Sequence, residues 1–299
     1  MKTALPTIAV FTKNRTNPAY AAARLGADRT AQRLGARTVH YVPRKPDDVD
    51  EQIALIDEAL GQRPDAITLV PVHPTAINAS IRKIGAAGVP LIGYLNRFSE
   101  PGPLAYVGAD DYSIGFKTGS YLCEHLKGRG NVVILEGASH SVTSVARVSG
   151  FRDALRSFPE VRVTAAICGD YLREPAQRAS AALLATPLRF DAVFAANDDM
   201  ALGMIAALAA ADRKSTIVGV NAIPEAITAI KQGALLATAD FNAMKISALA
   251  TEAAIRHLRG EVLPREITLP VEIVDRANHA EWDKPFEQRA LMTWEEALG

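Results

Sequence analysis

The 299-residue sequence lacks the marks of several common protein classes. It contains no apolar run of about 18 residues, so the pattern predicts no segment that spans a membrane. Lys plus Arg number 33 and Asp plus Glu also number 33, which leaves no basic excess of the kind that nucleic-acid binders carry. The first residues, 1–6, have no apolar core of a signal peptide, a pattern that a mature exported protein beginning at a new Met would share.

Sequence motifs of the common enzyme classes are also missing. There is no G-x-S-x-G elbow, no H-E-x-x-H, no Walker A loop and no G-x-G-x-x-G after the first predicted strand. The two cysteines, Cys123 and Cys168, form no CxxC and have no nearby His pair, which argues against zinc and against dithiol chemistry. The sequence therefore indicates a protein that is not an enzyme and that has no cofactor and no metal.

Short β-branched segments alternate with Ala-rich amphipathic segments along most of the chain. In the first half this pattern predicts strands at 7–11, 37–42, 66–70 and 89–93. The same rhythm restarts after Asp110, with predicted strands at 131–135, 161–167, 191–195 and 215–220. A strand at 235–239, a long helix at 243–259 and a strand at 269–274 follow. The spacing is that of βαβ units, so we predict an α/β fold with two similar doubly wound parallel-sheet lobes and a ligand cleft between them.

Polar side chains gather directly after the predicted strands, where parallel α/β sheets bind their ligands. These residues are Lys13, Asn17, Tyr20, Asn96, Arg97, Arg147, Tyr171, Asn197 and Asn221. Amides, guanidiniums and phenols suit vicinal hydroxyls and sugar ring faces. Other interpretations remain open, because Asn197 and Asp110 stand where helix N-caps belong and an arginine such as Arg147 is more often a solvated surface charge.

Several segments together resemble the ribose-type periplasmic sugar-binding proteins, which are solute-binding proteins of ABC transporters with the type I periplasmic binding protein fold. The most specific are N-D-D-M-A-L-G at 197–203 and R-V-S-G-F at 147–151. N-P-A-Y at 17–20 and G-V-P-L-I at 88–92 fit as well. The match extends in order from about residue 7 to residue 274.

The resemblance implies a three-segment hinge with crossings near Ala109, Asp240 and Leu269. The N-terminal lobe would then contain 1–109 plus 241–268, and the C-terminal lobe 110–240 plus 269–299. We expect the tail at 278–299 to pack on the second lobe. The ligand-binding residues that we expect from the polar residues and the resemblance together are Lys13, Asn17, Tyr20 as the stacking aromatic, Asn96, Arg97, Asp110, Arg147, Tyr171, Asn197, Asn221 and Phe241.

The function that the resemblance implies is capture of a small sugar or polyol by hinge closure in the periplasm. The partner would be the membrane permease of an ABC transporter or a chemoreceptor, with no nucleic acid and no direct membrane span. The alternative is the effector-binding domain of a LacI-type regulator, which shares the fold. That alternative needs an N-terminal DNA-binding domain, for which a first strand at residue 7 leaves no room.

The sequence departs from the family pattern at three of these positions. Asn96 and Asn221 stand where the family usually has Asp, and Phe241 stands where it often has Gln. The loss of two carboxylates leaves Lys13, Arg97 and Arg147 less compensated. An acidic sugar derivative is therefore a second candidate ligand.

Overall fold

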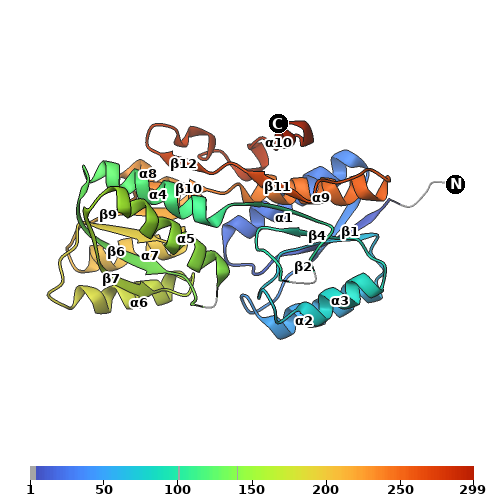
Figure 1. The fold of residues 1–299 in the computed structure, drawn as a ribbon, viewed down its shortest axis with the longest axis horizontal. Helices are drawn as coiled ribbons and strands as arrows, with labels where there is room; N and C mark the ends of the chain where they lie inside the picture. The colour runs from blue at the N-terminus through green and yellow to red at the C-terminus, as the bar shows by residue number, and fades with distance from the viewer. Residues whose placement is uncertain (1–4, 100–101, 140) are drawn as a thin grey trace. The chain divides into compact units, whose positions relative to one another are not determined.

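The computed structural model describes residues 5–99, 102–139 and 141–299, and these residues form two α/β units (Figure 1). Unit 1 contains the described residues up to Ala109 together with Asn242–Leu269 and Phe286–Gly299. Unit 2 contains Asp110–Phe241 and Pro270–Pro285. Within the described part of the chain, no helix combines the length and apolar character needed to cross a membrane.

Unit 1 is a six-stranded parallel sheet with the strand order β11-β5-β4-β3-β1-β2. Helices α1 and α9 pack together on one face and α2 and α3 lie on the other (Figure 1). The elements are β1 Thr7–Phe11, α1 Pro18–Leu34, β2 Arg37–Tyr41, α2 Val49–Gly61, β3 Ala66–Leu69, α3 Asn78–Ala86, β4 Leu91–Tyr94, β5 Ala105–Ala109, α9 Ala243–Leu258, β11 Glu266–Leu269, a 3-10 turn at Phe286–Gln288 and α10 Trp294–Leu298. Because both faces are covered, the central strands β1, β3, β4 and β5 are apolar and almost entirely buried.

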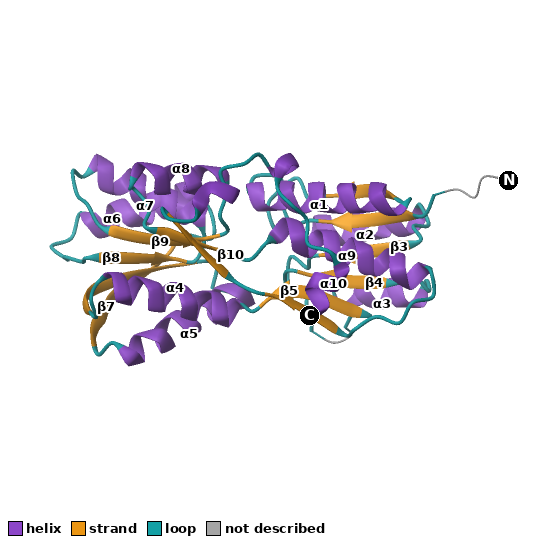
Figure 2. Cartoon of the chain, turned by 90° about the horizontal axis from the view of Figure 1, so that it is seen from above, coloured by secondary structure: helices purple, strands orange, loops and turns teal. Residues whose placement is uncertain are grey.

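Unit 2 repeats this plan with the strand order β12-β10-β9-β8-β6-β7, in which only the β10–β12 pair is antiparallel. Figure 2 shows α4 and α5 on one face of the sheet and α6, α7 and α8 on the other. The elements are α4 Asp111–His125, β6 Arg129–Glu136, α5 Val142–Ala154, a 3-10 turn at Leu155–Ser157, β7 Glu160–Cys168, α6 Arg173–Leu184, β8 Ala192–Ala195, α7 Asp198–Ala210, β9 Thr216–Val220, α8 Pro224–Gln232, β10 Ala237–Asp240, β12 Glu272–Asp275 and a 3-10 turn at His279–Glu281. The predicted fold class, two α/β lobes with mostly parallel sheets, is confirmed.

Two strand predictions were wrong. Strand β5 was not predicted, although it is fully buried between β4 and β11, because its small residues Ala105, Gly108 and Ala109 dilute the β-branched signal. The single strand predicted at 269–274 is two strands, which belong to different sheets. The break falls at Pro270, where the chain leaves unit 1 and where the residue has no N–H to donate to a ladder.

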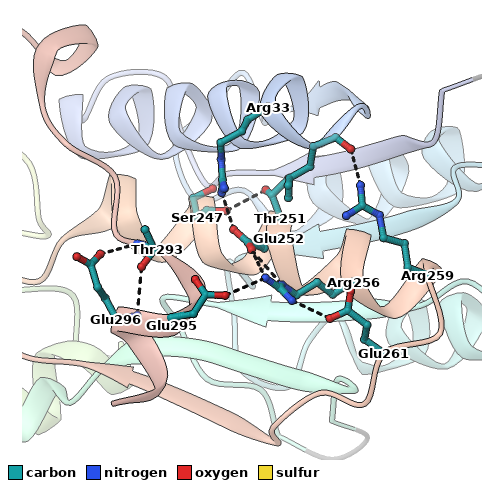
Figure 3. A network of polar contacts seen from close by, with 11 residues as sticks. Arg33, Ser247, Thr251, Glu252, Arg256, Arg259, Glu261, Thr293, Glu295 and Glu296 are labelled. Carbon is teal, nitrogen blue, oxygen red and sulfur yellow. Dashed lines mark hydrogen bonds and ion pairs between the residues drawn. The ribbon is translucent and has the colours of Figure 1, made fainter.

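The C-terminal tail differs from its prediction over residues 286–299, which belong to unit 1 and not to the second lobe. Figure 3 shows the polar contacts of α9 near this segment of unit 1. The carboxylate of Glu252 in α9 is only 2% exposed and bonds Arg33 of α1 at 2.6 Å and Arg256 at 3.0 Å. The guanidinium of Arg256 also lies over the ring of Trp294 in α10 at 4.8 Å. In Figure 3 it points toward Glu295, whose carboxylate is 3.5 Å away. The described chain therefore passes between the units at four points, after 109, 241, 269 and 285, where three were expected.

Candidate ligand-binding site

Arg147 is the best-anchored of the predicted site residues in unit 2. Its side chain projects from α5 and the residue is only 6% exposed, so the interpretation as a solvated surface charge is wrong. Nε donates to Oδ1 of Asp111 at 2.8 Å, and Nη1 donates to the carbonyl of Ala196, just after β8, at 2.8 Å. The guanidinium also lies over the ring of Phe241 at 5.4 Å. These contacts bring together predicted residues from two separate parts of the sequence, Arg147 and Phe241.

Two glycines explain why Asp111 and Arg147 meet. A Cβ on Gly115 of α4 would lie 1.8 Å from the carbonyl oxygen of Arg147, and a Cβ on Gly150 of α5 would lie 2.0 Å from that of Tyr112. Neither position has room for a side chain, so the backbones of α4 and α5 approach closely. The first turn of α4, which carries Asp111, therefore lies against the turn of α5 that carries Arg147.

Tyr171 and Asn197 form a second group in unit 2. Asn197 is the N-cap of α7, since Oδ1 accepts from the N–H of Met200 at 2.9 Å, while Nδ2 donates to the carbonyl of Tyr171 at 3.0 Å. The Tyr171 hydroxyl lies 3.0 Å from Oγ1 of Thr143, and burial raises the pKa of this phenol. Gly137 faces the Tyr171 ring, where an added Cβ would be 2.3 Å from the ring. Asn197 therefore caps α7 and also fixes the backbone that carries the aromatic ring.

Asn221 and Asp110 occupy less regular positions in unit 2. Asn221 follows β9 with φ 127°, and Ala222 follows it with φ 53°, so two non-glycine residues lie in the positive-φ region. Such strain is characteristic of functional sites. Asp110 is exposed and caps α4, accepting from the N–H of Tyr112 at 3.1 Å and from the hydroxyl of Ser113 at 2.5 Å. The carboxylate that pairs with Arg147 is thus that of Asp111 and not that of the predicted residue Asp110.

In unit 1, Lys13 and Asn17 lie in the loop that joins β1 to α1. Lys13 is 9% exposed and its Nζ lies 3.3 Å from Oδ1 of Asp47, which follows β2. Asn17 caps α1, because its Oδ1 accepts from the N–H of Ala19 at 2.9 Å. The buried Asn14 accepts from the N–H of Asn17 at 3.0 Å and so orders the loop.

The remaining predicted residues of unit 1 have diverse surroundings. Tyr20 is half-buried in the first turn of α1. Asn96 is half-buried after β4, with Nδ2 3.5 Å from the carbonyl oxygen of Pro71. Arg97 is exposed, pairs with Glu266 of β11 at 2.5 Å and lies over the ring of Tyr106 at 4.5 Å. Arg97 is therefore directed toward the edge of the sheet formed by β5 and β11.

The sequence interpretation did not assign a site role to Asp47 or Asp111, the two carboxylates that pair with buried cations. Each belongs to an Asp-Asp pair, and the pair that contains Asp111 comes directly after β5. Strand β5 was not predicted, so this pair was not recognised as following a strand. Lys13, Arg97 and Arg147, which were expected to be less compensated, each have a carboxylate partner in their own unit. Across the described ranges, no group of three or more His, Cys, Asp or Glu side chains has the arrangement of a metal site.

The chain passes between two doubly wound α/β units several times. This architecture defines the class of two-lobed α/β binding proteins. Within that class, the sequence profile described as the periplasmic binding protein domain matches residues 8–261. The chain belongs to this family, and the resemblance noted in its sequence is confirmed.

Curated relatives and solved structures agree with the family assignment. The xylitol-binding protein of Mycolicibacterium smegmatis is 29% identical over 193 residues, which are 64% of this chain and 55% of that protein. The ribose import binding protein of Haemophilus influenzae is 25% identical over 268 residues, covering 90% of this chain and 91% of its own. An ABC transporter periplasmic solute binding protein from Actinobacillus succinogenes 130z, solved with bound D-allose, is 27% identical with a TM-score of 0.86, covering 91% of this chain and 98% of its own. These relatives are binding proteins and not enzymes.

Proposed function

We propose that this protein captures a small neutral sugar or polyol in the periplasm and delivers it to the membrane permease of an ABC transporter, without catalysing a reaction. The relatives bind xylitol, ribose or D-allose according to their names, and such ligands present many hydroxyl groups and no charge. The proposed ligand residues lie at the carboxyl ends of strands in both units. We propose that the ligand is enclosed between the units when they close.

The pairing of each buried cation with a carboxylate is the observation that favours a neutral ligand over an acidic one. Lys13 pairs with Asp47 and Arg147 pairs with Asp111, and all four side chains belong to residues that are buried or only partly exposed. A ligand carboxylate would have to compete with these carboxylates for the same two cations. A hydroxyl group can both donate and accept a hydrogen bond, so a neutral ligand does not have to displace either carboxylate from its cation.

Matched ligand pairs test this proposal directly. Calorimetric titration and thermal shift would compare ribose with ribonate, xylitol with xylonate and allose with allonate. We expect saturable binding and a raised melting temperature with at least one neutral member, because a ligand that binds only the native state stabilises it by mass action. Binding of an acid at equal or higher affinity than its neutral partner would refute the neutral-ligand proposal. If neither member of any pair binds, the proposed sugar or polyol class is wrong.

A further inference from the structure

Unit 1 has a second candidate binding region, at the amino ends of its strands. A cavity of about 600 Å³ is lined by the end of α3, by the residues that lead into β4, β5 and β11, and by the last turn of α9. Figure 2 labels α3, β4, β5 and α9, and Figure 1 labels β11. The amino ends of parallel strands are the edge opposite the one that carries Lys13, Asn17 and Asn96. The volume is in the range of small-molecule sites, about 300–1,000 Å³.

The lining of this cavity is apolar on one side and cationic on the other. Its apolar residues are Ile81, Val89, Pro90, Leu91, Pro103 and Leu104. Leu104 is 43% exposed, so part of this apolar surface faces water in the free protein. The polar side chains are Arg82, His257 and Arg265, and no carboxylate of the described residues contributes to the lining. Among the described residues, neither arginine has a recorded ion pair.

The two carboxylates near Arg265 in the sequence pair with other cations. Glu261 bonds Arg256 at 2.7 Å, and Glu266 bonds Arg97 at 2.5 Å. Lys83, next to Arg82 in α3, pairs with Asp57 at 2.8 Å. A basic residue in the last turn of a helix complements the helix dipole, which explains the position of His257 without a ligand. Arg265 lies outside any helix and has no such explanation.

We propose that this cavity binds a small amphipathic anion, with its carboxylate or phosphate group on Arg82 and Arg265 and its apolar part on Leu91 and Leu104. A guanidinium binds either anion through two parallel hydrogen bonds. Water leaves the apolar lining when the hydrocarbon part enters, and this burial adds to the affinity. The site is separate from the proposed sugar site and does not depend on it.

The fluorescent anion 8-anilinonaphthalene-1-sulfonate is a suitable probe for this cavity, used with the full chain. We expect one saturable site, from which octanoate or octyl phosphate displaces the dye while 1-octanol and inorganic phosphate do not. Comparing the displacement of the dye by octanoate with its displacement by octyl phosphate shows whether the site prefers a carboxylate or a phosphate group. Absence of saturable dye binding, or displacement by 1-octanol as effectively as by the anions, would overturn the proposal.

Variants of residues that line the cavity test whether the anion binds there. The double change Arg82→Gln with Arg265→Gln should weaken dye binding at least 10-fold, and Leu104→Asp should do the same by repulsion at a position that is partly exposed. The matched control Lys83→Gln changes the adjacent charge in α3 outside the cavity and should bind as the wild type does. A wild-type circular dichroism spectrum and a cooperative thermal unfolding transition in every variant show that each is folded. Wild-type dye affinity in both cavity variants would show that the anion binds elsewhere.

Discussion

At the scale of single residues, the burial of Arg147 changes what its removal should do. A surface arginine could be removed with little loss of stability, but Arg147 is 6% exposed and bonds Asp111 and Ala196. We expect Arg147→Ala to weaken sugar binding by about 2–4 kcal/mol and to lower the free energy of unfolding by a similar amount, because the carboxylate of Asp111 loses its partner. Calorimetry and urea unfolding measure the two quantities.

The double variant Arg147→Ala with Asp111→Ala separates the two effects. It removes the unpaired carboxylate, so stability should partly return while sugar binding stays weak. Wild-type sugar affinity in Arg147→Ala would exclude Arg147 from the ligand site.

Asp198 gives a prediction about pH at the same scale. This carboxyl group is fully buried at the start of α7, where Oδ1 accepts from Thr238 at 2.7 Å and Oδ2 accepts from the N–H of Ile223 at 3.1 Å. Burial raises the pKa of Asp198 to about 7. In the unfolded chain the pKa is near 4. Between about pH 4 and pH 7 the unfolded state releases this proton and the native state keeps it, so the group's contribution to stability falls as the pH rises through that window.

The variant Asp198→Asn should therefore become more stable relative to the wild type as the pH rises from about 4 to 7, by up to about 4 kcal/mol. The amide imitates the neutral acid and does not titrate. Urea unfolding at one-unit pH intervals measures the difference. Asp57→Asn, at an exposed ion pair with Lys83, is the control and should show no such trend. A pH-independent difference for Asp198→Asn would mean that the native state already ionises this group at low pH.

At the scale of elements, the contact between α4 and α5 positions the site in unit 2. A methyl group at Gly115 would overlap the backbone of α5 at Arg147, and the helix would have to move. We expect Gly115→Ala to destabilise the protein by about 1–3 kcal/mol, as overpacking does, and to weaken sugar binding as well. Thermal unfolding and calorimetry measure the two effects.

The control for this change is Gly61→Ala, at the end of α2. An added Cβ there meets nothing within 4 Å, so the variant should be neutral or more stable by up to about 1 kcal/mol, because alanine has the higher helix propensity. If Gly115→Ala behaves like Gly61→Ala, the close approach of α4 and α5 does not constrain the site.

At the scale of the whole molecule, the proposed enclosure of the sugar predicts a change of dimensions on binding. Small-angle scattering should give a smaller radius of gyration with saturating sugar than without it, because the units close on the ligand. The acidic partner of the same sugar, which is not expected to bind, serves as the control. An unchanged radius in a sample whose binding is confirmed by calorimetry would refute closure.

The fold class followed from the sequence because βαβ spacing and buried apolar strands are local patterns. The prediction of strands from these patterns was wrong where small residues or a proline interrupt the β-branched segments, at β5 and at 269–274. The positions of Asp110 and Asn197 at helix N-caps were also predicted, because a cap requires only its own residue and the next turn.

Only the tertiary structure determines which charged side chains form ion pairs. Arg97 follows β4 and Glu266 begins β11, and only the order β4-β5-β11 in the sheet brings these distant residues to one edge. The burial of Arg147 and its pairing with Asp111 require the close approach of α4 and α5 that Gly115 and Gly150 allow. The sequence by itself determined which segments form strands and helices, because that choice depends on neighbouring residues. Which charges are neutralised, and hence the proposed preference for a neutral ligand, depends on contacts that only the folded chain makes.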